Sequence, residues 1–356
     1  MLCYRWLIRK MFAVLSLLIL FWIVYIIYTY NTKMNLIRAS RKDITHLNHK
    51  NMKYILQWTR RFSAPFDWMG EGNSAFVKYK CKYTNCYVTD DRSYFLDQRE
   101  IAFNGRDVIH LWPFQMPSQR SPRQKFIFGA MESPDNFPAC HENLDGFFNW
   151  TWTYKLDSDI RWGYLAIYDK NGQLVGPKVD MVWPNMTPVS EGLKAQLKKK
   201  TKAVAWFVSH CSTKSGREHY VSRLNNELKA FGLSVDIYGS CGSLTCPRNN
   251  EKSCFKMIKD DYHFYLSFEN SFSEDYVTEK LLTALNNYAV PIVFGAALYT
   301  RFLPDGSYID AKALGPTALA TEINSILENK TKFYDFFRWR NHFVYKGTDG
   351  PDDNCF

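Results

Sequence analysis

The sequence lacks internal repeats and low-complexity segments along its 356 residues, which excludes a solenoid and argues against a disordered chain. It also lacks a stripe of basic residues with interleaved aromatic residues, although its formal net charge is +10. The dense basic run at 198–202 is typical of a solvated linker, so we expect no nucleic-acid partner. The basic balance suits a small anionic substrate instead.

The second pair of ligands that a structural zinc site requires is also missing. Cys81 and Cys86 have four residues between them, as do Cys241 and Cys246, but no second tight cysteine or histidine pair lies near either. Because a structural zinc site needs such a second pair, disulfides are the favoured use of these cysteines. Eight of the nine cysteines follow residue 30, and an even number fits an oxidising compartment. Zinc remains the alternative, and the connectivity stays open at this point.

Charge is absent from residues 11–30, MFAVLSLLILFWIVYIIYTY, for about the length that spans a bilayer as a helix. A short basic flank precedes this segment and no small-residue cleavage site follows it, which favours a signal anchor over a removable signal peptide. We therefore expect a cytosolic tail (1–10), a transmembrane anchor (11–30), a polar stem (31–52) and a folded lumenal part. The alternative is a buried helix of a soluble domain.

Three Asn-X-Ser/Thr sequons agree with a lumenal folded part, because N-glycosylation belongs to secreted and lumenal proteins. They are at Asn149 (NWT), Asn185 (NMT) and Asn329 (NKT). Each tripeptide also arises by chance, so the interpretation depends on its agreement with the apolar segment and the cysteines.

The folded part divides into two regions of different pattern. Residues 53–195 contain short apolar segments separated by turns, and residues 168–185 have the composition of a loop. Residues 196–356 alternate apolar runs with helical spacing, as in AVAWFVS (203–209) followed by GREHYVSRLNNELKAFG (216–232). Such alternation predicts βαβ units on a parallel sheet. We expect an α/β protein with two Rossmann-like domains, 53–195 and 196–356, that face a cleft.

Ligands of parallel α/β sheets gather at the carboxyl ends of the strands, and three such ends carry candidate residues. After AVAWFVS come His210, Cys211 and then Arg217, which opens a helix where backbone amides and a guanidinium suit a phosphate. After the apolar KFIFGAM comes Glu132, a carboxylate placed to act as a general base at the cleft. The alternative in each case is a solvated side chain on a helix or loop.

The third strand end lies in FYLSFENSFSEDYVTEKLLTALNNYAVPIVFG, residues 264–295. Its S-x-x-E pattern, at 271–274, predicts the start of a helix over 276–287. Lys280 falls in the first turn of that helix, where the helix dipole disfavours a cation unless an anion shares the site. The alternative is a capped helix with a solvated Glu279–Lys280 pair.

The same segment resembles the donor-site signature of the α1,3-fucosyltransferases, approximately F-x-L-x-F-E-N-S, then Y-V-T-E-K, then V-P-[IV]-x-x-G. Other landmarks of that family occur in order: MESP (131–134), TWTYKLDSDI (151–160), WFVSHC (206–211) and YGSCG (238–242). The resemblance covers about residues 53–355. It implies an inverting GT-B glycosyltransferase that is a single-pass type II protein of the Golgi membrane with a lumenal catalytic domain.

The resemblance also implies the reaction, which moves L-fucose from GDP-fucose to the 3-hydroxyl of N-acetylglucosamine with inversion at the anomeric carbon. Glu132 would take the proton from the acceptor hydroxyl, and Arg217 and Lys280 would hold the diphosphate. The acceptor would be a glycan on a glycoprotein or glycolipid. Both the chitobiose-core GlcNAc of N-glycans and the antenna GlcNAc of Lewis or LacdiNAc type remain open.

Further residues receive roles by the same resemblance. Asn270, Tyr276 and Glu279 would contact the guanosine ribose or the fucose. His110 and Trp112 lie in a region where relatives differ, and they would shape the acceptor pocket or simply pack.

The segment Asp157-Ser158-Asp159 resembles the metal-binding DxD motif of other glycosyltransferases. In the α1,3-fucosyltransferases this segment belongs to the acceptor domain, and cationic side chains do the work of a metal. We therefore expect no metal site and no obligatory cofactor, with divalent cations at most stimulating the reaction.

Two departures from the family pattern concern the donor domain and the end of the chain. His210 stands where many relatives have Asn, and Cys355 stands alone where the family has two closely spaced cysteines. Within the donor domain we expect the disulfide pairs Cys211–Cys254 and Cys241–Cys246.

Two other function classes remain as alternatives. A catalytically silent glycan-binding relative is disfavoured because Glu132, Arg217 and Lys280 are all present. A glycosyltransferase with another nucleotide-sugar donor is disfavoured by the Y-V-T-E-K segment.

Overall fold

The computed structural model describes residues 18–29, 52–59, 69–78, 81–95, 99–111, 115–247 and 250–348. It separates into two units, residues 1–53 and 54–356. In the first unit residues 18–29 form a helix. Within the described ranges, no helix combines the length and apolar character that crossing a membrane requires. The remainder of the expected anchor, the tail (1–10) and nearly all of the stem (31–52) lie outside those ranges.

The first sheet of the larger unit has the strand order β2-β1-β3-β4-β5-β6. Its strands are β1 (Lys53–Gln57), β2 (Cys86–Thr89), β3 (Glu100–Asn104), β4 (Lys125–Ala130), β5 (Trp150–Thr153) and β6 (Ile160–Arg161). The pairs from β1 to β6 are parallel. Alternating residues of β3 serve two cores, with Ile101 and Phe103 on one face and Ala102 on the other. The short helices α3 (Ser74–Lys78) and α4 (Gly105–Val108) accompany this sheet.

The second sheet has the order β10-β9-β11-β12-β13 and is parallel throughout. Its strands are β9 (Lys202–Phe207), β10 (Val235–Tyr238), β11 (Tyr262–Phe268), β12 (Val290–Phe294) and β13 (Ile309–Asp310). Its helices are α5 (Glu191–Leu197), α6 (Arg217–Leu228), α7 (Glu251–Asp261), α8 (Glu279–Asn286), α9 (Ala311–Glu328) and α10 (Lys330–Asp335). The predicted strand–helix alternation and the α/β fold with parallel sheets are confirmed.

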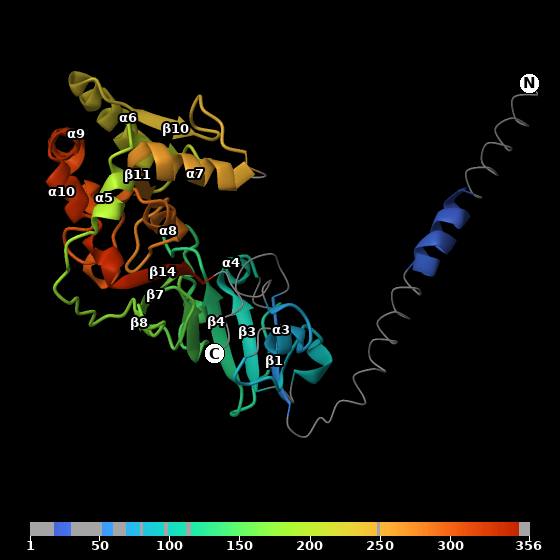
Figure 1. The fold of residues 1–356 in the computed structure, drawn as a ribbon. Coiled ribbons are helices and arrows are strands. Elements are labelled where there is room, and N and C mark those ends of the chain that lie inside the picture. The colour runs from blue at the N-terminus through green and yellow to red at the C-terminus, as the bar shows by residue number, and fades with distance from the viewer. Residues whose placement is uncertain are drawn as a thin grey trace, which may run out of the picture. The chain divides into compact units, whose positions relative to one another are not determined.

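Helices cover both faces of the second sheet, as buried parallel strands require. One core joins the sheet to α5, α6, α9 and α10, for example through Leu224 and Ile323 against Leu266. The opposite core includes Ile258 of α7 and Ala284 of α8, packed near Tyr265 of β11. Figure 1 shows α7 and α8 next to β11. The carboxyl ends of these strands therefore form one open edge of the sheet.

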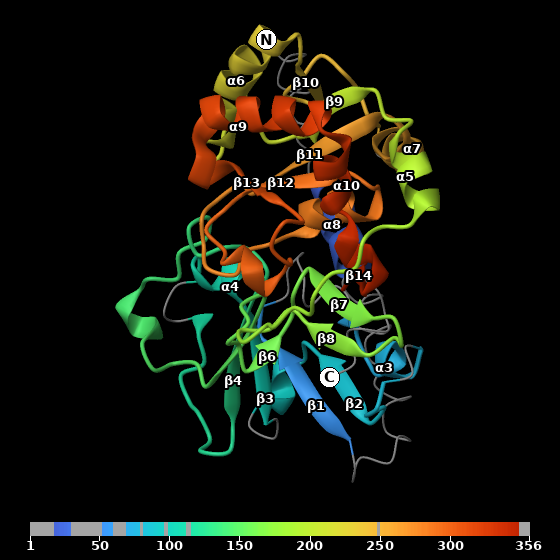
Figure 2. The ribbon, with the colours of Figure 1, turned by 60° about the vertical axis from the view of Figure 1, so that its left-hand side comes forward.

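A third, antiparallel sheet was not expected from the sequence. It has the order β14-β7-β8, with β7 (Leu165–Asp169), β8 (Leu174–Gly176) and β14 (Phe343–Gly347). The prediction of a loop over 168–185 is therefore wrong for part of that range. The strand β7 pairs with β14, which is far away in the sequence, and with its neighbour β8. Local composition does not report the pairing with β14. Figure 2 shows β14, in red, beside β7, in green.

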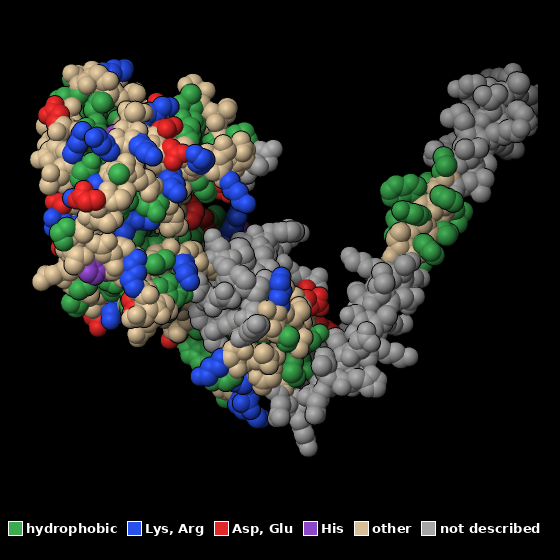
Figure 3. Space-filling model, in the orientation of Figure 1, with side chains coloured by type: hydrophobic (Ala, Val, Ile, Leu, Met, Phe, Trp, Pro, Cys, Tyr) green, Lys and Arg blue, Asp and Glu red, His purple; other side chains and the backbone are tan. Residues whose placement is uncertain are grey.

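Basic side chains do not form one cluster on the face of the molecule drawn in Figure 3. There, Lys and Arg side chains are scattered among acidic, apolar and uncharged ones. The dense run at 198–202 includes Lys200, which is only 5% exposed because its ammonium donates to the backbone carbonyls of Ile258, Lys259 and Tyr262. This part of the run is therefore a buried helix-end contact rather than the solvated linker that was predicted.

Candidate active site

Six residues singled out from the sequence line one cavity of about 440 Å³: Glu132, Arg217, Asn270, Tyr276, Glu279 and Lys280. They come from loops that follow β4 and β11 and from the starts of α6 and α8. The loop after β9 contributes His210, which is exposed. The structure thus brings together residues from both sheets at the carboxyl ends of their strands, as predicted.

A second cavity of about 670 Å³ lies over the loops of the first sheet. Its lining includes Phe137 and Trp162 together with the polar residues Lys155 and Asp157. Glu132 and Tyr164 line both this cavity and the first one. Glu132 therefore stands where a group bound in one cavity can meet a group bound in the other.

The carboxylate of Glu132 is held from one side. Its Oε2 accepts a hydrogen bond from the Tyr276 hydroxyl at 2.9 Å and another from Asn136 Nδ2 at 3.3 Å. Its Oε1 has no hydrogen-bond partner among the described residues. The backbone before Glu132 is fixed as well, because the Tyr164 hydroxyl donates to the Met131 carbonyl at 2.6 Å. One carboxylate oxygen is therefore positioned and the other is available.

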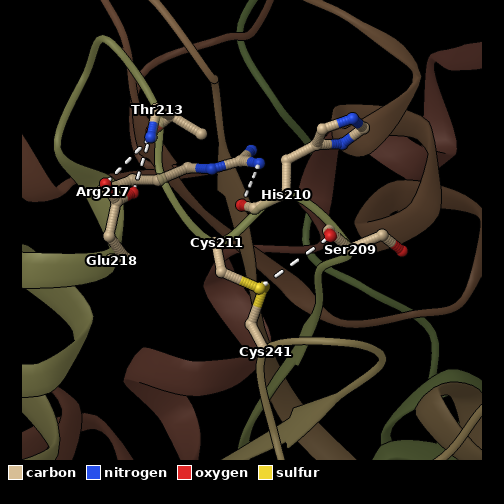
Figure 4. The surroundings of a disulfide bond; sticks show 7 residues. All are labelled: Ser209, His210, Cys211, Thr213, Arg217, Glu218 and Cys241. Atoms are coloured by element: carbon tan, nitrogen blue, oxygen red, sulfur yellow. Dashed lines mark hydrogen bonds between the residues drawn. A yellow bond between two sulfur atoms is a disulfide. The ribbon is translucent and has the colours of Figure 1, made fainter.

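Arg217 is the first residue of α6 and is 4% exposed. Its Nη1 donates to the Phe268 carbonyl at 2.6 Å. Its Nη2 donates to the His210 carbonyl at 3.4 Å (Figure 4). Its buried Nε lacks a partner in the described part of the chain. Burial lowers the pKa of Arg217, while the nearby Glu269 carboxylate opposes that effect. A buried guanidinium with an unused donor suits an anionic ligand.

The loop that leads into Arg217 is ordered by hydrogen bonds. Glu218 accepts from the backbone N–H and the hydroxyl of Thr213, both at 2.9 Å. Ser215 donates from its hydroxyl to the Glu269 carbonyl at 2.7 Å. Gly216 has a positive φ of 63°, which a residue with a side chain rarely adopts, and it allows the turn into α6. These contacts join the loop after β9 to the loop after β11.

Lys280 lies against two carboxylates. Its Nζ is 3.3 Å from Glu269 Oε2, 3.2 Å from Glu279 Oε1 and 2.7 Å from Thr278 Oγ1. Although burial opposes the charge, Glu269 and Glu279 raise the pKa of Lys280, so the ammonium stays protonated. A cation at a helix start was expected to share its site with an anion. The carboxylates of Glu269 and Glu279 supply that negative charge.

Glu269 is a site residue that the sequence analysis did not select. It is 1% exposed, and burial raises its pKa, although Lys280 acts in the opposite direction. Its Oε1 accepts the backbone N–H of Thr278 at 2.9 Å, which caps the start of α8. Its position directly after a buried strand was the only signal in the sequence.

The helix predicted over 276–287 is shorter, Glu279–Asn286, and the capping pattern at 271–274 does not start it. Asp275 has a positive φ of 56°, which is incompatible with a right-handed helix. The next residues also use their backbone groups elsewhere, since the Thr278 N–H donates to Glu269. Tertiary contacts of the segment thus override its local helix signal.

Other predicted residues lie apart from the two cavities. His110 is exposed and lines neither of them, and Trp112 lies outside the described residues. The sequon residues Asn149, Asn185 and Asn329 are all exposed.

The segment Asp157–Asp159 does not bring its carboxylates together on a metal. Asp157 pairs with Lys155 at 3.3 Å, and Asp159 Oδ2 accepts from the backbone and hydroxyl of Thr151 at 2.8 and 2.9 Å. In the part of the chain that the structure describes, no group of three or more His, Cys, Asp or Glu residues could hold a metal ion.

The four predicted disulfide cysteines are paired differently from the expectation. The bonds are Cys211–Cys241 and Cys246–Cys254, not Cys211–Cys254 and Cys241–Cys246. Because β9 and β10 are neighbours in the sheet, the loops that follow them meet, and Figure 4 shows Cys241 beside Cys211. Cys81 is also disulfide-bonded, whereas Cys355 lies outside the described residues.

Removing these bonds is expected to have unequal effects on stability. Cys211 and Cys241 are 30 residues apart in sequence, and Cys246 and Cys254 are 8 apart. By the chain-entropy model, replacing the first pair by Ser should lower the free energy of unfolding by about 3–4 kcal/mol, and the second by about 2–3 kcal/mol. Denaturant unfolding would measure both, with Cys140→Ser as the control because Cys140 carries a free thiol. Equal or reversed losses would contradict the expectation.

Comparison with known proteins identifies the family to which this chain is related. The family model "Fucosyltransferase, N-terminal" matches residues 50–165, and "Glycosyltransferase family 10 (fucosyltransferase) C-term" matches residues 197–355. The α-(1,3)-fucosyltransferase C of Drosophila melanogaster is 35% identical over 93% of this chain and 80% of its own length. The 4-galactosyl-N-acetylglucosaminide 3-α-L-fucosyltransferase of Pan troglodytes is 34% identical over 84% of this chain and 76% of its own length.

A solved α1,3-fucosyltransferase structure with GDP-fucose superimposes with a TM-score of 0.49 at 14% identity, covering 82% of each chain. Such a score is too low to support a conclusion by itself. The two family models and the identity to curated relatives over most of their length are decisive: this chain belongs to the α1,3-fucosyltransferases of glycosyltransferase family 10.

Proposed function

We propose that this chain transfers L-fucose from GDP-fucose to the 3-hydroxyl of GlcNAc in a glycan, with inversion at the anomeric carbon. The observation that carries the proposal is the placement of Glu132. This carboxylate lines both cavities, whereas Arg217 and Lys280 line only the smaller one. The donor is therefore assigned to the smaller cavity and the acceptor to the larger one.

Arg217 and Lys280 stabilise the leaving diphosphate. As the fucose–phosphate bond breaks, negative charge grows on GDP, and two cations placed in advance, the buried Arg217 and the partly buried Lys280, lower the energy of that state. The amides at the starts of α6 and α8 add partial positive charge. Without donor, Lys280 is neutralised by Glu269 and Glu279, so the phosphates compete with these carboxylates for its ammonium.

Asn270 and Glu279 contact the ribose or the fucose. Asn270 lines the donor cavity, and its backbone carbonyl accepts the Ser215 N–H at 3.0 Å, which fixes the backbone at that point. Glu279 is half-exposed beside Lys280, and its second carboxylate oxygen remains for a sugar hydroxyl.

Glu132 takes the proton of the acceptor hydroxyl through Oε1. The hydroxyl oxygen attacks the anomeric carbon from the face opposite to the phosphate, and one such displacement converts the β-linked donor into an α-fucoside. The chain's own cations stabilise the leaving group, so we propose no obligatory metal.

Transfer assays with labelled nucleotide sugars and defined glycans test the proposal. We expect incorporation from GDP-fucose into GlcNAc-containing acceptors. A comparison of trimmed N-glycans with LacNAc and LacdiNAc chains then identifies the acceptor class. Incorporation from a different nucleotide sugar, or glycan binding without transfer from any donor, would overturn the proposal and support one of the two alternatives.

We also propose two Rossmann-like domains of GT-B type in a single-pass type II protein of the Golgi membrane. The apolar segment 11–30, the three exposed sequons and the disulfides support a lumenal catalytic part. Treating the protein from a eukaryotic cell with an N-glycan-removing enzyme should increase its mobility on a gel. An unchanged mobility, together with release from membranes by carbonate at high pH, would contradict this placement.

A further inference from the structure

We propose that Tyr276 is a positioning residue for the general base, holding Oε2 of Glu132 so that Oε1 takes the proton. This inference rests on the proposed role of Glu132. It gives Tyr276 a function in the proton-transfer half of the reaction, in addition to its place in the wall of the donor cavity.

The hydrogen bond joins loops of the two parallel sheets. The Tyr276 hydroxyl lies 2.9 Å from Glu132 Oε2, across 144 residues of sequence, and the Asn136 amide supports the same oxygen at 3.3 Å. Burial raises the pKa of Tyr276 far above its ordinary range, with contributions from Tyr164 and Glu132. The hydroxyl therefore remains protonated and serves as a donor to the carboxylate.

The Tyr276 ring cannot easily leave this position. It is 2% exposed, and its centroid lies 4.9 Å from that of Tyr154 and 6.1 Å from that of Tyr164. The Tyr154 hydroxyl donates to Ser273 Oγ at 3.0 Å, and the Tyr164 hydroxyl holds the Met131 carbonyl. The three rings thus fix both the backbone and the side chain of the base.

The backbone that carries Tyr276 is anchored directly before it. Asp275 is 2% exposed and accepts from Arg301 Nη1 at 2.9 Å and from the Leu156 N–H at 3.2 Å. Ser271 and Ser133, both fully buried, share a hydroxyl–hydroxyl hydrogen bond of 2.5 Å. Residues 271–276 are therefore held against the loops of the first sheet.

The same segment continues into the diphosphate-binding residues. Thr278 donates to Glu269, and Lys280 pairs with the same carboxylate. A single stretch of chain, 276–280, thus contacts the base at one end and carries Lys280 at the other. Because this segment holds Glu132 through Tyr276 and carries Lys280, it fixes the separation of the two groups, which an in-line displacement needs.

Tyr276→Phe tests the inference, because it retains the ring and removes only the hydroxyl. We expect kcat to fall roughly 10- to 100-fold, while the donor KM and the Kd of GDP change less than about 3-fold. Tyr345→Phe is the matched control. Tyr345 is 3% exposed, its hydroxyl donates to the Phe302 carbonyl at 2.9 Å, and it lines neither cavity. Unfolding curves of both variants show whether stability is affected equally.

A double-mutant cycle with Glu132→Gln distinguishes positioning from donor binding. If Tyr276 acts through Glu132, adding Tyr276→Phe to Glu132→Gln should lower kcat no further. Independent, multiplicative losses, or a raised donor KM at unchanged kcat, would overturn the inference and leave the proposed function intact. Near-normal activity of Glu132→Gln alone would instead remove the base role on which both depend.

Discussion

Replacing Glu132 by Gln is expected to lower kcat by roughly 10²- to 10⁴-fold, the usual contribution of general-base catalysis. Gln keeps the shape of the side chain and can still accept the Tyr276 hydroxyl, but it cannot take a proton. Because Glu132 is not among the phosphate-binding residues, the Kd of GDP should change less than about 3-fold.

Steady-state transfer rates with GDP-fucose and calorimetric titration with GDP would measure the two quantities separately. Glu142→Gln provides a matched control, since Glu142 is exposed and lines neither cavity. A Glu132→Gln enzyme that keeps near-normal kcat would exclude this carboxylate as the base. A large loss of GDP affinity would instead assign Glu132 to donor binding.

Replacing Lys280 by Met should impair both catalysis and folding. Loss of a preorganised charge at the leaving group is expected to lower kcat by roughly 10²- to 10³-fold. The free energy of unfolding should fall by about 3–5 kcal/mol, because Glu269, 1% exposed, would lose its paired cation. Lys194→Met removes a lysine from an exposed pair with Glu191 and should cost less than about 1 kcal/mol.

Adding Glu269→Gln to Lys280→Met separates the two effects. With both charges of the buried pair removed, stability should recover most of the loss, whereas kcat should stay low because the phosphates still lack the ammonium. Denaturant unfolding and transfer assays on the single and double variants would measure this. Recovery of kcat in the double variant would show that Lys280 acts only through the fold.

The sequence predicted which residues would gather at one cavity where a strand end or a helix start marks them. Glu132, Arg217 and Asn270 follow apolar runs, and parallel strands bring such positions to one edge. The sequence analysis did not select Glu269, because the pattern around an acidic residue after a strand does not indicate whether its side chain is buried. Its role depends on Lys280 and Thr278, which lie beyond a turn whose path the local pattern did not predict.

The errors share the same origin. The helix start at 276 was wrong because Asp275 is held at positive φ by contacts with Arg301 and Leu156, residues from elsewhere in the chain. The Cys211–Cys241 bond followed from the adjacency of β9 and β10, and β14 formed because it met β7. Proximity in sequence was a poor guide in each case.

The amino-acid sequence by itself determined the α/β pattern, the strand ends that carry the reactive groups and the family signature. These are encoded in hydrophobic periodicity and in residues a few positions apart. Only the tertiary structure decided that one oxygen of Glu132 is held by Tyr276, that Lys280 is neutralised by a buried carboxylate, and which cysteines are joined. Such pairings form when the packing of strands and helices brings separate loops into contact, and short-range propensity does not describe that packing.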